Sequence, residues 1–181
     1  MILTNTSRYP QAEVEKIVAF AFSDIPDANV AIHVKGSKYG IAGRAYPAIP
    51  RMSPSHGKAE MLVVARIGPE SKFPKDNMVE SRRWVKVKAG ELSDSSTTRF
   101  VQSSAGDYRE RLVISKHPYG GKNSPLITMN TWREGLVALL SHEARHIYQF
   151  MNTKPLSEVD AESYASTRLN EWRTTNQEVS R

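Results

Sequence analysis

The chain has 181 residues, of which 39% are hydrophobic and 24% are charged, and this composition is typical of one folded domain with a substantial core. It excludes collagen, a coiled coil and a wholly disordered chain. Because the sequence contains no cysteine, disulfide bonds, zinc ribbons, iron–sulfur clusters and thiol catalysis are excluded too. Any bound metal ion would therefore need histidine and carboxylate ligands.

No segment is predicted to enter a membrane. The sequence has no run of about 18 apolar residues, and its N-terminus lacks the charged start and apolar stretch of a secretory signal. We therefore expect a cytoplasmic protein. The formal net charge of +6 is compatible with an acidic partner such as nucleic acid, but the densest basic groupings, within 82–88 and 109–111, are also typical of a solvated face.

The first predicted elements are a helix and three strands. Pro10 suits the first turn of a helix, and apolar residues recur at helical spacing as far as residue 22. Alternating apolar residues predict strands over 29–35, 39–46 and 60–67. The segment 36–38 contains a glycine and indicates a hairpin turn between the first two strands.

The middle of the chain is predicted to be less regular. Residues 68–82 are interpreted as an irregular loop, 84–88 as a short exposed strand and 111–115 as the last strand. Ser, Thr and Gly dominate residues 89–106, which predicts a polar, mobile loop.

The last third of the chain is predicted to be helical. Thr131 and Glu134 fit a capping box, and the apolar stripe that follows them predicts a helix over 131–151. Ser157 opens a second helix, which runs to about residue 173. The order of a helix, several strands and two helices indicates a single α+β domain over the whole chain.

The long predicted helix contains the motif His142-Glu143-Ala144-Arg145-His146. Residues four apart on a helix lie one turn above each other, so both imidazoles can reach one zinc ion. Glu143 projects beside the metal, where it can hold the attacking water and accept its proton. The alternative interpretation is a helix with two ordinary histidines near the surface.

A zinc hydrolase site also needs a third protein ligand, and a carboxylate is expected because no histidine follows His146. Glu158 and Glu162 are predicted to share the apolar face of the second helix, where two unpartnered carboxylates would be costly. We therefore predict Glu158 as the ligand and Glu162 as the residue that orients an imidazole. Asp160, which suits a capping position, stays an alternative ligand, and favourable interaction with the helix dipole is an alternative role for both glutamates.

These residues resemble the active site of the zincin metallopeptidases, specifically the gluzincin type. The pattern His142-Glu143-x-x-His146 followed by Glu158-x-x-x-Glu162 is similar to their active-site helix and following helix, with Glu162 where Asp is common. The layout is similar to compact SprT-like proteases and minimal gluzincins, but the cysteine-rich zinc ribbon of many SprT-like proteins is absent. The resemblance implies a compact domain with an N-terminal helix, a small, mainly antiparallel, twisted sheet, a long active-site helix and a C-terminal helix.

The predicted activity is hydrolysis of peptide or protein substrates with one Zn²⁺ per chain. Glu143 takes the proton of the attacking water and delivers it to the leaving amine. The developing oxyanion needs a further donor. The candidates for this donor are Tyr119, His117, Tyr148 and Arg145.

The two remaining histidines are not predicted to bind the metal. His33 is interpreted as a strand-surface histidine and His56 as a loop histidine.

Two other functions remain open on the sequence alone. One is a non-catalytic basic domain that binds nucleic acid or protein and uses zinc only for structure, in a closed four-ligand site with His117 as a candidate fourth ligand. The other is a protease recruited to DNA by its basic surface, as in a DNA-associated SprT-like protein. Salt-sensitive DNA binding together with zinc-dependent cleavage would distinguish the latter.

Overall fold

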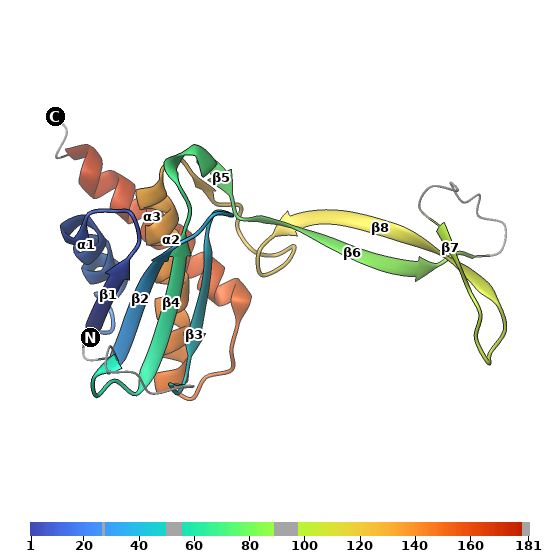
Figure 1. The fold of residues 1–181 in the computed structure, drawn as a ribbon, viewed down its shortest axis with the longest axis horizontal. Coiled ribbons are helices and arrows are strands. Elements are labelled where there is room, and N and C mark those ends of the chain that lie inside the picture. The colour runs from blue at the N-terminus through green and yellow to red at the C-terminus, as the bar shows by residue number, and fades with distance from the viewer. Residues whose placement is uncertain (27, 50–55, 89–97, 179–181) are drawn as a thin grey trace.

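The computed structural model describes residues 1–26, 28–49, 56–88 and 98–178. The chain folds as an α+β protein, as predicted. A four-stranded sheet and three helices form the body of the molecule, and a second, three-stranded sheet extends from this body as a long arm (Figure 1).

The sheet of the body has the strand order β1-β2-β4-β3. Its strands are β1 (Ile2–Thr6), β2 (Val30–Gly36), β3 (Ala42–Tyr46) and β4 (Met61–Ile67). β2 runs parallel to β1 and to β4, whereas β3 is antiparallel to β4. A hairpin at 36–38 was predicted to pair the segments that form β2 and β3. This prediction is wrong, because both edges of β2 are occupied by β1 and β4.

The central position of β2 also explains why its alternating pattern is misleading. All residues from Val30 to Val34 are buried, including His33, which is buried rather than on the strand surface as predicted. A strand buried on both faces is typical of parallel pairing. Strand β1, which the sequence analysis did not predict, supplies one of the two parallel partners.

The helices of the body are α1 (Gln11–Ala21), α2 (Trp132–Met151) and α3 (Glu158–Glu178). The three predicted helices are therefore confirmed, although α3 extends beyond residue 173. At the start of α2, Thr131 accepts a hydrogen bond from the Glu134 backbone N–H, while the Glu134 carboxylate accepts one from Asn130 N–H. The main core contains buried side chains from the helices and the sheet, among them Val14, Ile17, Ile32, Val63, Leu136, Leu140, Ile147 and Leu169.

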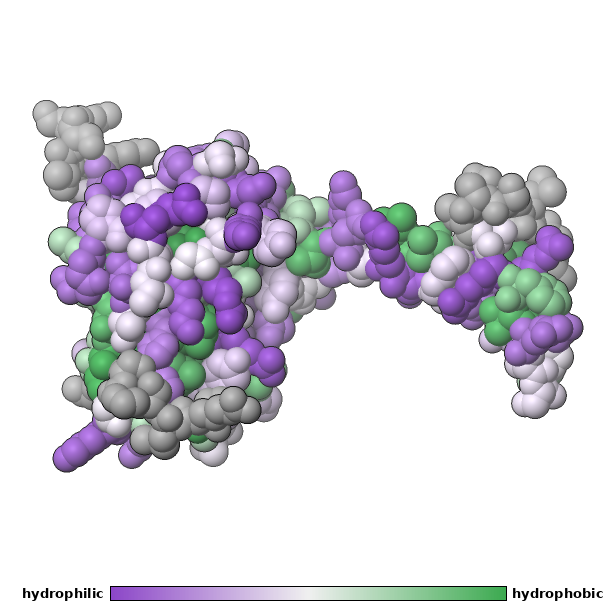
Figure 2. Space-filling model, in the orientation of Figure 1, coloured by the Kyte–Doolittle hydropathy of each residue, from purple (hydrophilic) through white to green (hydrophobic). Residues whose placement is uncertain are grey.

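The arm consists of β6 (Met78–Lys86), β7 (Thr98–Val101) and β8 (Tyr108–Pro118), in the order β6-β8-β7 with antiparallel pairing throughout. None of its described residues is buried. Figure 2 shows hydrophobic and hydrophilic side chains together on the surface of the arm. β6 and β8 were predicted as short strands over 84–88 and 111–115. Both are much longer than expected, because backbone pairing continues through polar residues.

Two predicted loops also need correction. The expected loop 68–82 contains the 3₁₀ turn η2 (Glu70–Lys72), strand β5 (Lys75–Asp76) and the beginning of β6. β5 pairs with β9 (Thr128–Met129) in a small antiparallel sheet. In the expected loop 89–106, residues 98–101 form β7, while residues 89–97 lie outside the described part of the chain. Antiparallel pairing thus prevails outside the body, whereas two of the three strand pairs in the body sheet are parallel.

None of the described helices is long and apolar enough to cross a membrane.

Candidate metal centre

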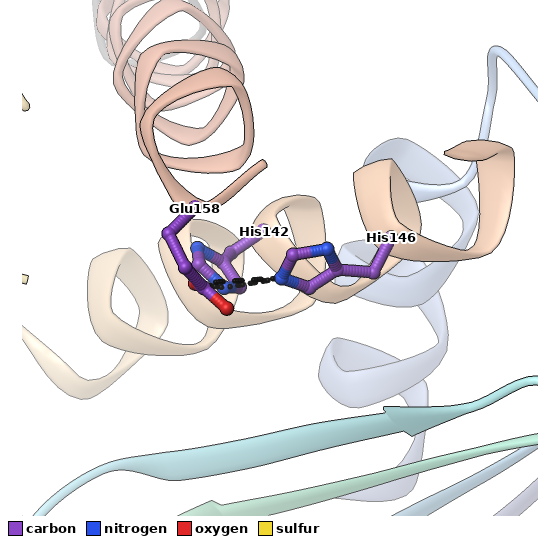
Figure 3. A group of neighbouring side chains, drawn as sticks. All are labelled: His142, His146 and Glu158. Atoms are coloured by element: carbon purple, nitrogen blue, oxygen red, sulfur yellow. Dashed lines mark hydrogen bonds and ion pairs between the residues drawn. The ribbon is translucent and has the colours of Figure 1, made fainter. Parts of the chain in front are cut away.

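The candidate site lies where α3 begins against the middle of α2. His142 and His146 stand one turn apart on α2, and Glu158, the first residue of α3, reaches across to them (Figure 3). Both histidines are buried, with 6% and 7% of their surface exposed. The Glu158 side chain is about half exposed, so the group meets solvent on the side of the carboxylate.

Three potential ligand atoms converge in this group. The two Nε2 atoms of His142 and His146 lie 3.0 Å apart. Oε2 of Glu158 lies 3.2 Å from Nε2 of His142 and 3.5 Å from Nε2 of His146. A tetrahedral zinc ion with bonds of about 2.0–2.2 Å places its ligand atoms roughly 3.3 Å from one another. The spacing of the three atoms therefore fits a zinc ion, and these residues form a candidate metal group within the described chain.

The ring of His146 is oriented by Gln149, which the sequence analysis missed. Nδ1 of His146 lies 2.9 Å from Oε1 of Gln149, which also accepts from the Ser157 backbone N–H. The Gln149 amide nitrogen donates to Asp160. Because Oε1 is an acceptor, the proton of His146 resides on Nδ1, and Nε2 presents a lone pair to the site. Its position three residues after His146 in the predicted helix was the only sequence signal for Gln149.

Glu162, the predicted orienting carboxylate, lies against the ring of His142 on the side opposite the three ligand atoms. Oε1 of Glu162 lies 3.0 Å from Nδ1 of His142, although the N–H direction is not aligned for an ideal hydrogen bond. Burial lowers the pKa of His142, but the contact with Glu162 and the nearby charges of Glu143 and Glu158 outweigh it and raise this pKa above its usual value. The acidic surroundings thus favour a cation at this place.

Asn77 fixes the second oxygen of Glu162. Its amide nitrogen donates to Oε2 of Glu162 at 2.6 Å and to the Pro125 carbonyl at 3.0 Å. Its amide oxygen accepts from the Ile127 backbone N–H. Asn77 lies between β5 and β6, at the root of the arm. The sequence offered no signal for it, because residue 77 was interpreted as part of a loop.

The Nδ1 atoms of both histidines face carboxylate or amide oxygens, and their Nε2 atoms lie 3.0 Å from each other and within 3.5 Å of a carboxylate oxygen. Either a proton shared among these atoms or a metal ion between them offsets their mutual repulsion, and two imidazole nitrogens with a carboxylate oxygen are ligands that zinc accepts. This chemistry of the donor set, together with the spacing, fits a zinc ion held by His142, His146 and Glu158.

Glu143 lies beside this group and lines a cavity of about 280 Å³ together with His142, Glu162 and Tyr119. Only 4% of its surface is exposed. Burial is the largest of the effects that together raise the pKa of Glu143 to about 7; the charge of Glu158 acts in the same direction, and His142 opposes it. A carboxyl group with this pKa can both accept and release a proton near neutral pH.

Strand β3 forms the wall of the cavity next to Glu143. Ala42 and Gly43 line the cavity, and the backbone of Ala45 forms a hydrogen bond that favours the ionised Glu143 carboxylate. Gly43 has no side chain at the point where β3 approaches α2, and a Cβ at this position would collide with Oε1 of Glu143. An added Cβ would therefore require the ends of the Glu143 and Leu139 side chains to shift.

Tyr119 is the one predicted oxyanion donor that lines the cavity in the described structure. Its ring centroid lies 5.7 Å from that of His142. Burial, followed by the charges of Glu158, Glu143 and Glu162, raises the pKa of Tyr119, so its hydroxyl stays protonated and available as a donor.

The other predicted site residues lie outside the cavity. Asp160 forms a two-pronged ion pair with Arg145, with distances of 2.7 and 2.9 Å, so its carboxylate is engaged away from the three ligand atoms. The Arg145 guanidinium also packs over the Tyr148 ring, whose hydroxyl accepts from Lys154. His117 is on the arm, with Nδ1 2.9 Å from the Pro118 carbonyl oxygen.

His33 and His56 do not belong to the candidate site. Their ring centroids lie 4.9 Å apart and both residues are buried, so they form a separate pair, and His33 is not on the strand surface as predicted. Comparison of the chain with protein-family models, with curated proteins and with solved structures found no match. The chemistry of this site therefore has to be inferred from its own residues.

Proposed function

We propose that this chain is a zinc-dependent peptidase in which His142, His146 and Glu158 hold one Zn²⁺. The observation that carries the proposal is the convergence of two imidazole nitrogens and a carboxylate oxygen within 3.5 Å of one another. A buried glutamate and a cavity next to this group are what a hydrolase needs in addition to its metal ligands.

When bound, zinc supplies Lewis-acid chemistry, which polarises a carbonyl group and makes water more acidic. In this proposal Glu143 accepts a proton from the attacking water and later delivers it to the nitrogen of the leaving amine, so that the C–N bond breaks as the amine becomes neutral. The Tyr119 hydroxyl, in the same cavity, donates to the oxygen on which negative charge develops.

The remaining contacts hold these groups in place. Glu162 and Gln149 orient the two imidazoles through their Nδ1 atoms, and Asn77 in turn fixes Glu162. The pair Arg145–Asp160 ties α2 to the start of α3, next to Glu158. This network keeps the three ligand atoms together before any metal binds, which reduces the cost of ordering them.

The first test is the metal itself. Protein purified without chelators should contain about one zinc per chain by elemental analysis. Glu158→Gln should lower zinc affinity by at least about 100-fold, a larger loss than is usual for residues that only support a ligand. Asp160→Asn is the comparison variant, and it should lower zinc affinity less than Glu158→Gln, because Asp160 supports the ligands through Arg145 and Gln149 without being one of them. A purified chain without zinc affinity, or the reverse order of the two variants, would contradict the ligand set.

The second test separates catalysis from metal binding. Fluorescently labelled casein serves as a general protein substrate, and wild-type cleavage should stop when zinc is removed. Glu143→Gln should reduce cleavage about 10²–10⁴-fold, as expected for the loss of a general base, while zinc stays bound. Glu15→Gln, at an exposed position on α1, is the matched control. Zinc binding without cleavage of any substrate would instead indicate a structural zinc domain.

A further inference from the structure

The two faces of the arm differ in charge. Directly opposite residues in a sheet point to the same side, and successive residues point to opposite sides. Arg83 lies opposite Val113, Arg111 opposite Val85 and Arg109 opposite Phe100. The three arginines therefore share one side of the arm, which we call the arginine face. Among the described residues of the three strands, no Asp or Glu lies on this face.

The opposite face neutralises much of its own charge. Arg82 pairs with Glu80 and Arg99 pairs with Glu110, both at 2.7 Å. Cations also cover its aromatic rings, since Arg99 lies over Trp84 at 4.3 Å from the ring centroid. In the described part of the arm, by contrast, Arg83 and Arg109 have no ion pair with a carboxylate, although such pairs are formed on the other side of the same strands.

The arm also carries a large share of the excess charge of the chain. Its described residues, 78–88 and 98–118, include eight Lys or Arg and three Asp or Glu, a formal charge of +5. With Glu91 and Asp94 of the segment 89–97, the region 78–118 has a formal charge of +3, half of the +6 of the whole chain. The charge is thus displayed on the part of the molecule that projects farthest from the body (Figure 1).

The dimensions of the arginine face match a nucleic-acid backbone. Arg83 is in register with Val113, so it lies four residues from Arg109 along β8, which corresponds to roughly 14 Å. Each strand of a DNA duplex carries a phosphate about every 3.4 Å along the axis, so this length spans about four phosphates.

The aromatic residues favour a duplex over a single strand. Single-stranded nucleic acid binds through bases stacked on exposed aromatic rings. Among the described strand residues on the arginine face, only Phe100 and His117 are aromatic, and His117 lies at the root of the arm. Trp84 and Tyr108 lie on the other face, where Arg99 and Lys86 cover their rings. The arginine face therefore offers cations for phosphates but little stacking surface.

We propose that the arginine face of the arm binds the phosphate backbone of double-stranded DNA without sequence preference. The proposal is independent of the peptidase activity, because it uses residues of the arm and none of the candidate metal centre.

The test is fluorescence anisotropy with a fluorescein-labelled 30-base-pair duplex and with one of its strands alone, over a series of salt concentrations. The wild-type chain should bind the duplex more tightly, with an affinity that falls steeply as salt rises. The double variant Arg83→Gln/Arg109→Gln should bind at least about tenfold more weakly. The slope of log affinity against log salt should become shallower by about 1.8, or about 0.9 for each lost phosphate contact.

The matched control is Arg82→Gln/Arg99→Gln, which removes the same two charges from the opposite face and should change affinity about threefold or less. Melting temperatures and zinc contents of both variants show whether the body is intact. An equal loss in the two double variants, tighter binding of the single strand, or no duplex binding at 50 mM salt would overturn the proposal. Sedimentation data that show self-association of the chain through the arginine face would also overturn the proposal.

Discussion

Gly43 allows a direct test of how closely β3 must approach the candidate catalytic glutamate. An alanine Cβ at this position would meet Oε1 of Glu143 and would lie 2.7 Å from Cδ1 of Leu139 and 3.0 Å from Cδ of Glu143. Ordinary contacts between carbon atoms are about 3.5–4.0 Å. The substitution Gly43→Ala therefore has to shift the ends of the Leu139 and Glu143 side chains or the helix α2 that carries both.

Two opposing effects determine the stability of Gly43→Ala. Replacing glycine reduces the entropy of the unfolded chain and favours the variant by about 0.4–1 kcal/mol. Overpacking next to α2 costs about 1–3 kcal/mol. We expect the overpacking to prevail, with a net loss of about 1–2 kcal/mol and a melting temperature lower by about 2–8 °C for a chain of this length. A shift of Glu143 by about 1 Å would also reduce cleavage about 100-fold.

Thermal unfolding and casein cleavage measure these two effects, and zinc content shows whether the metal ligands are intact. Gly36→Ala is the matched control in the same sheet, because no atom lies within 4 Å of its added Cβ. It should melt at the same temperature as the wild type or slightly higher. If Gly43→Ala retained both its melting temperature and its cleavage rate, the close packing of β3 against Glu143 would be refuted.

Three further predictions concern pH, metal affinity and the core. Burial raises the pKa of the Glu134 carboxyl, but the hydrogen bonds that this group accepts, above all from Arg173, lower the pKa below 4.5 overall. The ionised carboxylate therefore stabilises the fold above pH 4.5, and this stabilisation is lost on acidification. The difference in melting temperature between wild type and Glu134→Gln should therefore be larger at pH 7 than at pH 3, and a constant difference would contradict this assignment. Asn77→Ala removes a donor to Glu162 and should weaken zinc binding about 10–100-fold in a chelator competition assay, whereas an unchanged affinity would exclude a positioning role. Leu140→Ala should lower the free energy of unfolding in urea by about 2–5 kcal/mol, because this side chain is fully buried, and a loss below about 1 kcal/mol would show that the core collapses around the gap.

The helices and most of the candidate ligand group could be predicted from the sequence because their signals are local. Thr131 and Glu134 marked the start of α2, and the spacing of His142 and His146 follows directly from one helical turn. Placing Glu158 and Glu162 on one face of α3 required only helical geometry, and the structure brings both to His142.

The sheet order and the contacts around the histidines could not be predicted, because they depend on residues far apart in the sequence. The parallel partners of β2 are β1 and β4, neither of which follows it directly in the chain. Asn77 reaches Glu162 across 85 positions of the sequence. The length of β6 and β8 and the presence of β7 escaped prediction for another reason, since strands without a buried face have a weaker hydrophobic pattern by which strands are recognised.

The register at the root of the arm makes this part of the molecule separable from the rest. Met78 and Pro118 are paired across β6 and β8, so the chain leaves the body and returns to it at points about 5 Å apart. A tight two-residue connection could bridge that distance in place of the intervening 39 residues, 79–117. The same spacing would allow the ribbon to be grafted onto another protein at any surface hairpin, as an exchangeable module.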